Sequence, residues 1–338
     1  MDMADTGIAL ARDVAGSLLA TVVDDLEQVG GGRNSRVFRV RCQRGSFALK
    51  QYPSLEDDPR HRLQTEVEAL RLMERQDFAD VPRVVAADPA RGFAAFTWIG
   101  GSPVGAVGER DIDQACEFLA RVHALRRAPV LALDRLASEA CLSGAEIERQ
   151  IAARTTALAV PANETPELQV FLGREFASAG GRLVERAKRM AGDAGFGFAT
   201  PLVQSRRSLV PSDFGFHNAI RRPDGSLAFI DFEYFGWDDP VKLTADVLFH
   251  PGMPLDARQR ARFRTHAERS FGDDAQFEAR LDAYLPLFGL RWALIVLNEF
   301  LPQRWRLRQA AGTTATWDEV KRRQLALARR LVAQAEAA

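Results

Sequence analysis

The sequence predicts an α+β fold in which a small strand-rich lobe precedes a larger, mainly helical lobe. Three observations predict this order. Strand-like alternation of apolar and polar residues is concentrated before residue 101, around one amphipathic helix. After residue 101 the apolar period becomes helical almost to the C-terminus. A short strand-rich interval, residues 208–233, interrupts the helices with an Asp-Gly turn typical of a hairpin.

The small lobe is expected over residues 26–100, after a helical extension over residues 1–25. Its centre is a hairpin that follows three consecutive glycines, and the second strand of that hairpin carries Lys50. Apolar residues spaced three and four apart then predict a helix. In chain order, the expected elements are a helix over 7–20, strands over 36–41 and 46–52, a helix over 59–75, and strands over 81–86 and 92–99.

The large lobe is expected over residues 101–338, and it contains the loop 211–218 and a hairpin whose end lies at 230–233. Strands over 219–221 and 227–230 form this hairpin around Asp224-Gly225. Helical periodicity accounts for the rest of the lobe. The expected helices cover residues 111–127, 143–157 and 166–192, and three or four more follow between about 256 and 336.

Composition narrows the classes of protein. The chain has 338 residues, which suffices for one large two-lobed domain, and its 46% hydrophobic content is ordinary for a soluble protein. Its 45 basic and 45 acidic residues cancel, which disfavours a nucleic-acid partner because such proteins usually carry a basic excess. Three separated cysteines form no CxxC pair and no zinc-ligand spacing, so no structural metal is expected.

The sequence predicts neither a secretory signal peptide nor a transmembrane helix. Its acidic N-terminus lacks the basic stretch that opens a secretory signal. The apolar segment Leu285–Leu297 contains Arg291 and is shorter than the roughly 20 residues of a membrane span. A buried helix and a cytoplasmic location are therefore expected, and the oligomeric state stays open.

The residues that carry chemistry lie around the predicted hairpin. The loop 211–218 contains Asp213 and Asn218 in the pattern D-x-x-x-x-N, and the far strand of the hairpin ends at Asp231. Phosphoryl transfer needs metal ions that bridge nucleotide phosphates, and Mg²⁺ prefers oxygen ligands. It also needs a carboxylate beside the attacking hydroxyl. One loop and one strand end supply these groups.

This arrangement resembles the aminoglycoside phosphotransferase and choline kinase family, whose fold is bilobal and protein-kinase-like. The family's loop reads H-G-D-x-x-x-x-N and is followed about eighteen residues later by I-D-[FW]-[EG]; here Asp231 lies eighteen positions after Asp213. The resemblance covers roughly residues 25–300. It implies transfer of the γ-phosphate of ATP or GTP to a hydroxyl group of a small molecule, with Mg²⁺ as cofactor. It also implies that Asp213 is catalytic and that Asn218 and Asp231 bind the metal.

The small lobe carries matching residues. Its glycine-rich turn resembles the loop over the nucleotide phosphates, although an ordinary hairpin turn has the same composition. Lys50 resembles the strand lysine that contacts the α- and β-phosphates, and Glu66 resembles its partner on the next helix; a surface pair is the alternative. Residues 96–101 resemble the hinge that meets the purine edge, or an ordinary strand end. The nucleotide-binding residues implied are Gly31, Gly32, Asn34, Ser35, Lys50, Glu66, Trp98 and Ile99.

Other residues have structural interpretations. The family's loop histidine is taken to be replaced by Ser212, which can still donate one hydrogen bond. His217 is expected to brace the loop, His123 to pack in a helix, and Asp246 to brace the loop from a helix, as in the family. Residues 236–240 resemble the family's G-D-P segment. The arginines at 304–308, beside Trp305, are read as a solvated helix end rather than a nucleic-acid surface.

The acceptor is not specified by these motifs. A pocket for it is expected from residues 140–200 and 235–310, where arginines are as dense as carboxylates. This favours a sugar-like or amino-alcohol-like acceptor over an aminoglycoside, which is the alternative substrate. A pseudokinase, acting as a nucleotide-binding scaffold, and a nucleotidyl transferase are the alternative functions.

Overall fold

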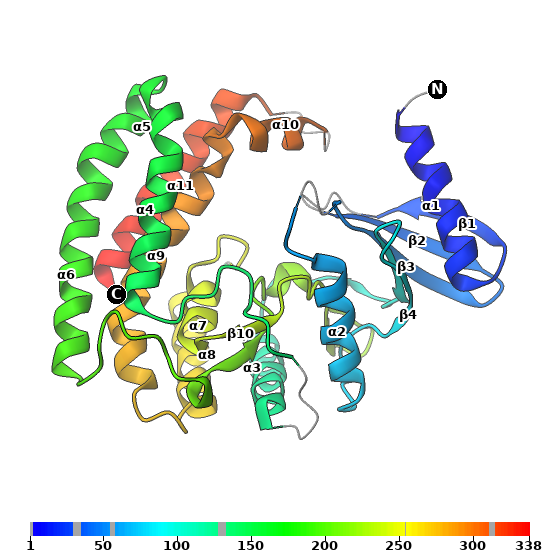
Figure 1. Cartoon of the computed structure of the whole chain (residues 1–338), viewed down its shortest axis with the longest axis horizontal. Helices are drawn as coiled ribbons and strands as arrows, with labels where there is room; N and C mark the ends of the chain where they lie inside the picture. Colours follow the sequence, from blue (N-terminus) through cyan, green and yellow to red (C-terminus); the bar gives the residue numbers. More distant parts are fainter. Residues whose placement is uncertain (1–2, 30–34, 55–57, 128–132, 254, 311–314) are drawn as a thin grey trace. The chain divides into compact units, whose positions relative to one another are not determined.

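The computed structural model describes residues 3–29, 35–54, 58–127, 133–253, 255–310 and 315–338. An antiparallel sheet with one helix comes first and a largely helical part follows, which confirms the predicted α+β fold (Figure 1). The chain gathers into two compact units, Met1–Ala115 with Pro211–Gly236, and Cys116–Val210 with Trp237–Ala338. The lobe boundaries near residues 25 and 100 stay predictions.

The first unit is built on a five-stranded antiparallel sheet of order β1-β2-β3-β5-β4. In the register of β2 and β3, Val37 pairs with Lys50 and Arg39 with Ala48. Side chains of paired residues point to the same face of a sheet, so these four residues share one face. The strands are β1 (Val23–Gln28), β2 (Arg36–Cys42), β3 (Gly45–Gln51), β4 (Val84–Asp88) and β5 (Phe93–Thr97).

The two faces of this sheet carry different helices. Helix α1 (Met3–Leu19) covers the apolar face (Figure 1). Helix α2 (Arg62–Glu74) lies on the face that carries Lys50, because Glu66 on this helix bonds to Lys50. The apolar core under α1 consists of Ala11, Val14, Ala15, Leu19, Val23, Phe38, Val40, Leu49, Phe93 and Ala95. The sheet therefore reserves one face for its core and leaves the other for charged groups.

A second sheet of order β6-β8-β9 completes the first unit. It consists of β6 (Ser102–Pro103), β8 (Ala219–Arg221) and β9 (Leu227–Phe229), and the predicted hairpin is confirmed. Gly101 has φ 149°, and a Cβ there would lie 2.3 Å from the Arg221 carbonyl oxygen, so only glycine allows this approach. Beyond the hairpin, Ile230 N donates to Asn218 O at 2.9 Å. This bond joins the loop 211–218 to the segment 230–233.

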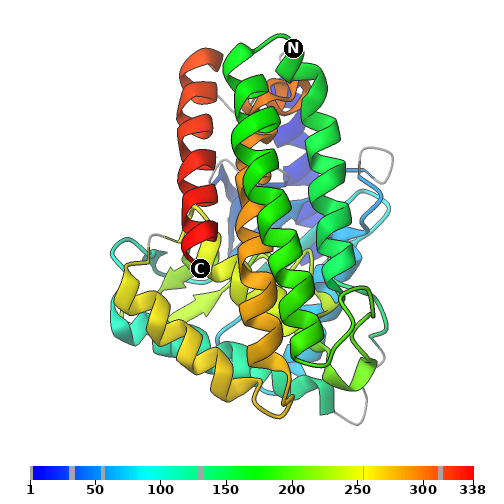
Figure 2. The same ribbon diagram turned by 90° about the vertical axis from the view of Figure 1, so that its left-hand side faces the viewer.

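The second unit is mainly helical. Helices α4, α6 and α11 pack along the central helix α9 (Figure 2). The short strands β7 (Ser208–Val210) and β10 (Gly236–Asp238) pair with each other. The described helices are the end of α3 (Glu109–Ala124), α4 (Gly144–Asn163), α5 (Pro166–Val170), a π-helical segment (Phe171–Phe176), α6 (Ala177–Asp193), α7 (Pro240–Phe249), α8 (Ala257–Ser270), α9 (Phe277–Val296), α10 (Pro302–Ala310) and α11 (Trp317–Ala337).

Several element bounds differ from the sequence-based prediction. Helix α2 begins at Arg62 rather than at Pro59, and β4 begins at Val84, after Pro82, whose ring removes a backbone donor. The helix predicted over 166–192 contains a π-helical segment, which periodicity does not reveal. Helix α9 and the turn after it are long and apolar enough to cross a membrane, but 78% of the apolar window is buried inside the protein. This burial matches the buried helix predicted there.

Candidate active site

The loop 211–218 is held by bonds among its own residues. The Asn218 side-chain amide donates to the backbone carbonyl of Asp213 at 2.9 Å, and His217 Nε2 lies 3.3 Å from Asp213 Oδ1. The ring of Phe214 packs on Phe229 with centroids 5.0 Å apart, which anchors the loop to β9. The Asp213 carboxylate remains partly exposed. The loop therefore presents a carboxylate to solvent, with His217 beside it.

Ser212 corrects one sequence-based alignment. Its φ of 66° lies in the left-handed region that favours glycine. Counting back from Asp213, Ser212 occupies the glycine position of H-G-D, and Pro211 occupies the position of the histidine. The substitution of the loop histidine by Ser212 was therefore wrongly assigned. Ser212 Oγ is buried and has no hydrogen-bond partner among the residues that the structure describes.

Lys50 is the buried centre of the site. Its Nζ lies 2.7 Å from Glu66 Oε2, 2.6 Å from Asp231 Oδ1 and 3.0 Å from Glu233 Oε2. Burial alone would lower the pKa of Lys50, but Glu66 and the other carboxylates outweigh it and hold the pKa well above the usual range. Lys50 is therefore a permanent cation, and the ion pair expected with Glu66 is present. Glu68 bonds instead to Gln64.

Besides their contacts with Lys50, Glu66 accepts a backbone hydrogen bond and Asp231 has a left-handed backbone conformation. Glu66 accepts from the Tyr52 hydroxyl at 2.6 Å and from Phe232 N at 3.2 Å. Asp231 has φ 70°, a conformation that aspartate tolerates better than most residues. Its side chain is 32% exposed, so the carboxylate is reachable while it contacts Lys50. Burial raises the pKa of Asp231 to about 6, against the opposing effect of Lys50.

Glu233 is a site residue that sequence reasoning missed. It is buried and accepts from Ser35 Oγ at 3.0 Å and from Arg62 at 2.5 Å, in addition to its contact with Lys50. Burial would raise the pKa of Glu233, but Lys50 and Arg62 outweigh it and lower the pKa. The signal was present in the sequence, since Glu233 ends the segment Ile-Asp-Phe-Glu that was used only for its aspartate.

The carboxylates suit a hard cation. Oxygens of Glu66, Asp231 and Glu233 lie within 4.8 Å of one another. An all-oxygen donor set is the kind that Mg²⁺ prefers. Asn218, the other predicted ligand, is tied to the Ile230 backbone and therefore stays close in the fold to Asp231. The residues present thus fit a magnesium site that includes Asp231.

The remaining predicted nucleotide residues are only partly described. Ser35 is in place against Glu233, whereas Gly31, Gly32 and Asn34 lie outside the described residues. Trp98 and Ile99 follow the end of β5. The Arg39 guanidinium lies over the Trp98 ring, 4.7 Å from its centroid, on the sheet face that carries Lys50.

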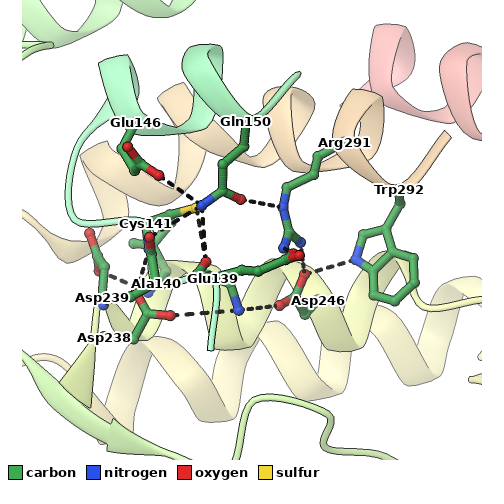
Figure 3. Close-up of polar contacts among 12 residues, drawn as sticks. Glu139, Ala140, Cys141, Glu146, Gln150, Asp238, Asp239, Asp246, Arg291 and Trp292 are labelled. Carbon is green, nitrogen blue, oxygen red and sulfur yellow. Dashed lines mark hydrogen bonds and ion pairs between the residues drawn. The ribbon is translucent and has the colours of Figure 1, made fainter. Parts of the chain in front are cut away.

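The second unit holds the residues that resembled the G-D-P segment and the bracing aspartate (Figure 3). Asp246 accepts from Lys242 at 2.8 Å and from the Trp292 indole at 2.8 Å, and Arg291 lies 3.5 Å away. Asp238 accepts from Cys141 N at 2.8 Å. Asp239 caps α7 and is bound by Arg280. These contacts make a buried network inside the second unit, and the bracing of the loop by Asp246 stays a prediction.

His123 and Trp305, interpreted as structural from the sequence, both pack against other side chains. His123 is buried, with Nδ1 2.9 Å from Ser208 Oγ and its ring against Phe271. Burial, followed by nearby arginines, lowers the pKa of His123 to about 4, so it is neutral at physiological pH. Trp305 stacks on Trp317 with centroids 5.8 Å apart, while Arg304 and Arg306 beside it are exposed and Arg308 is half-buried against Glu299. This matches the solvated helix predicted there.

Comparisons with known proteins agree with the geometry. The model of the family described as "Phosphotransferase enzyme family" matches residues 25–275. No curated protein sequence matches the chain. Among solved structures, the chain is similar to a spectinomycin phosphotransferase in complex with ADP and spectinomycin, with 10% identity, a TM-score of 0.63, and 97% and 98% of the two chains covered.

Two further structures show the same fold. A choline kinase from Streptococcus pneumoniae has 16% identity and a TM-score of 0.59, with 96% of this chain and 98% of that chain covered. An ADP-bound aminoglycoside phosphotransferase, APH(2'')-Ib, has 16% identity and a TM-score of 0.54, with 97% and 98% covered. At these identities the likeness shows the fold, and it confirms the predicted kinase-like architecture.

Proposed function

This chain belongs to the phosphotransferase enzyme family as a small-molecule kinase, and from that premise we propose that it transfers the γ-phosphoryl group of ATP or GTP to a hydroxyl group. The observation that carries the proposal is the convergence of Glu66 and Asp231 on the buried ammonium of Lys50. The same unit presents the partly exposed carboxylate of Asp213. A fixed cation for phosphates and a solvent-accessible carboxylate for a hydroxyl are two groups that this transfer requires.

Each residue has a distinct role in the proposed reaction. Lys50, held by Glu66, contacts phosphate oxygens as a permanent cation. Asp231 and Asn218 hold Mg²⁺, which when bound offsets the negative charge on the phosphates. Asp213 accepts a hydrogen bond from the acceptor hydroxyl and aligns its oxygen with the γ-phosphorus. As the new P–O bond forms and the bond to the β-phosphate oxygen breaks, Asp213 takes the hydroxyl proton.

For the acceptor we propose a sugar-like or amino-alcohol-like molecule. A choline kinase of the same fold supports this proposal, whereas a spectinomycin phosphotransferase of that fold supports the alternative of antibiotic modification. Function lies in sites rather than in folds, so the acceptor must be found by turnover. ADP release in the presence of sugars or amino alcohols supports the proposal, and release with aminoglycosides alone replaces it with antibiotic modification.

The nucleotide site is tested by thermal unfolding with ATP and GTP, each with and without Mg²⁺. A ligand that binds only the native state raises the melting temperature. The wild type should show a Mg²⁺-dependent rise that Asp231→Ala loses. The control is Asp224→Ala, an exposed carboxylate in the β8–β9 turn, which should keep the rise.

The outcomes separate the alternatives. The absence of any shift in the wild type would contradict the proposed nucleotide site. A shift without turnover for any acceptor would indicate a pseudokinase scaffold. The mass of the product distinguishes phosphoryl from nucleotidyl transfer.

A further inference from the structure

Arg62 is a buried cation next to the proposed site with no role in the mechanism above. It is the first residue of α2, and its Nη1 donates to Glu233 Oε1 at 2.5 Å. Its Nη2 donates to the carboxylate of Asp58, and its guanidinium lies over the Tyr234 ring, 5.0 Å from the centroid. These contacts hold the guanidinium in one orientation against Glu233.

Arg62 reduces an excess of negative charge around Lys50. Three carboxylates, those of Glu66, Asp231 and Glu233, contact the single ammonium of Lys50. Lys50, Glu66 and Glu233 are buried, where charges interact more strongly than in water. Arg62 is a second buried cation, and it shares Glu233 with Lys50. Asp58, the other partner of Arg62, is also bound by Arg60.

The net charge of these buried groups affects the binding of two ligands of opposite charge, a divalent cation and a nucleoside triphosphate. An excess of carboxylates attracts a divalent cation and repels a nucleoside triphosphate. In the structure, Ser35 and Lys50, both proposed nucleotide contacts, bond to the same oxygen of Glu233, while Arg62 bonds to the other. Glu233 therefore keeps a charged partner when Ser35 and Lys50 turn to phosphate oxygens.

We propose that Arg62 is a positioning residue that holds Glu233 on the α2 side and sets the relative affinity of the site for nucleotide and divalent cation. The proposal rests on the proposed function, because it concerns the same nucleotide site. Arg62 acts through Glu233 and contacts no ligand itself. Its removal should therefore change the two affinities in opposite directions, which a loss of structure alone would not do.

The experiment measures two binding constants by calorimetry on the full chain: nucleotide in EDTA, with ATP and GTP, and Mg²⁺ alone. Arg62→Met should weaken nucleotide binding about tenfold and tighten Mg²⁺ binding, because one buried positive charge is lost. Glu233→Gln should do the reverse. The double variant Arg62→Met/Glu233→Gln restores the net charge and should return both constants toward wild type. Arg62→Lys keeps the charge and should lie closest to wild type.

Arg91→Met is the matched control, since it removes a cation of the first unit that contacts Asp88, Asp13 and Ser17 instead. A fall in both affinities of Arg62→Met, or no change in either, would overturn the inference. If Arg62→Met does not fold, Glu233→Gln and the double variant still differ in their expected nucleotide affinity, which is tighter than wild type for the first and close to wild type for the second. Failure of the wild type to bind either nucleotide, even with Mg²⁺, would refute the proposed function instead.

Discussion

Each compact unit contains a buried lysine among carboxylates, and the two sites differ in what surrounds them. Lys50 in the first unit contacts Asp231, whose side chain is 32% exposed. Lys242 in the second unit lies between Asp246, at 2.8 Å, and Asp238, at 3.6 Å, and both carboxylates are buried (Figure 3). Asp246 also binds Arg291 and the Trp292 indole, so its partners are all protein groups.

The difference in surroundings distinguishes the proposed ligand site at Lys50 from a structural site at Lys242. Around Lys242, Arg291 adds a second buried cation beside the two buried carboxylates, and the Trp292 indole donates to Asp246. Around Lys50 the carboxylates outnumber the cation, and Asp231 remains reachable in a left-handed conformation. Similar residues therefore hold the structure in one unit and are available for chemistry in the other.

The strongest test of this contrast is a variant of the proposed site in the first unit, which should lose turnover while it keeps its stability. Asp213→Ala should lower kcat by about 10³-fold, because it removes the group that we propose accepts the hydroxyl proton. Nucleotide affinity and the melting temperature should stay near wild type, since the carboxylate is partly exposed. Steady-state kinetics and calorimetry measure these quantities. Turnover near the wild-type rate would contradict the assignment of Asp213.

The second unit should respond in the opposite way. Lys242→Met removes the cation that the buried carboxylates of Asp238 and Asp246 share and leaves Asp246 with Arg291, which should lower the free energy of unfolding by about 3–5 kcal/mol. Urea unfolding measures the change. The control is Lys321→Met, a surface pair with Asp318 that should cost no more than about 1 kcal/mol. Equal costs for both lysines would refute the structural role of Lys242.

Stability should depend on pH through Asp238. Burial raises the pKa of Asp238 to about 6, from an ordinary value of 3.8. Between these values the folded state holds a proton that the unfolded state has lost. The contribution of Asp238 to the free energy of unfolding therefore falls as pH rises from about 4 to 6, by up to about 3 kcal/mol. The stability of wild type relative to Asp238→Asn should decrease over this range, and a constant difference would contradict the shift.

The smallest effect is expected at Ser212. Its left-handed φ of 66° costs a non-glycine residue about 1 kcal/mol, and its buried hydroxyl has no partner among the described residues. Ser212→Gly should therefore raise the free energy of unfolding by about 0.5–1 kcal/mol. Ser102→Gly, in strand β6, should lower it instead, because glycine adds freedom to the unfolded chain. Both values come from denaturant unfolding.

The sequence predicted the parts of this molecule that depend on local pattern. The order of sheet and helices and the hairpin after Asn218 follow from periodicity and turn residues. The pairing of Lys50 with Glu66 was implied by the resemblance to the family. Arg62 could not be recognised, because arginine is abundant in the chain and the contact with Glu233 joins residues 171 positions apart. The glycine-like conformation of Ser212 was missed because Ser212 was aligned with the histidine of H-G-D, whereas counting back from Asp213 gives the glycine position.

The first unit is assembled from two stretches of chain, and this division has a consequence for synthesis. Lys50 and Glu66 belong to the stretch that ends at Ala115, while Asp231 and Glu233 belong to the stretch that ends at Gly236, 121 residues later. At about 5–20 residues per second, a ribosome needs about 6–24 s to cover that distance. Throughout this interval the nascent chain lacks Asp231 and Glu233, and α2 lacks the backbone donor of Phe232. The proposed active site is thus completed only after the residues between the two stretches have been translated.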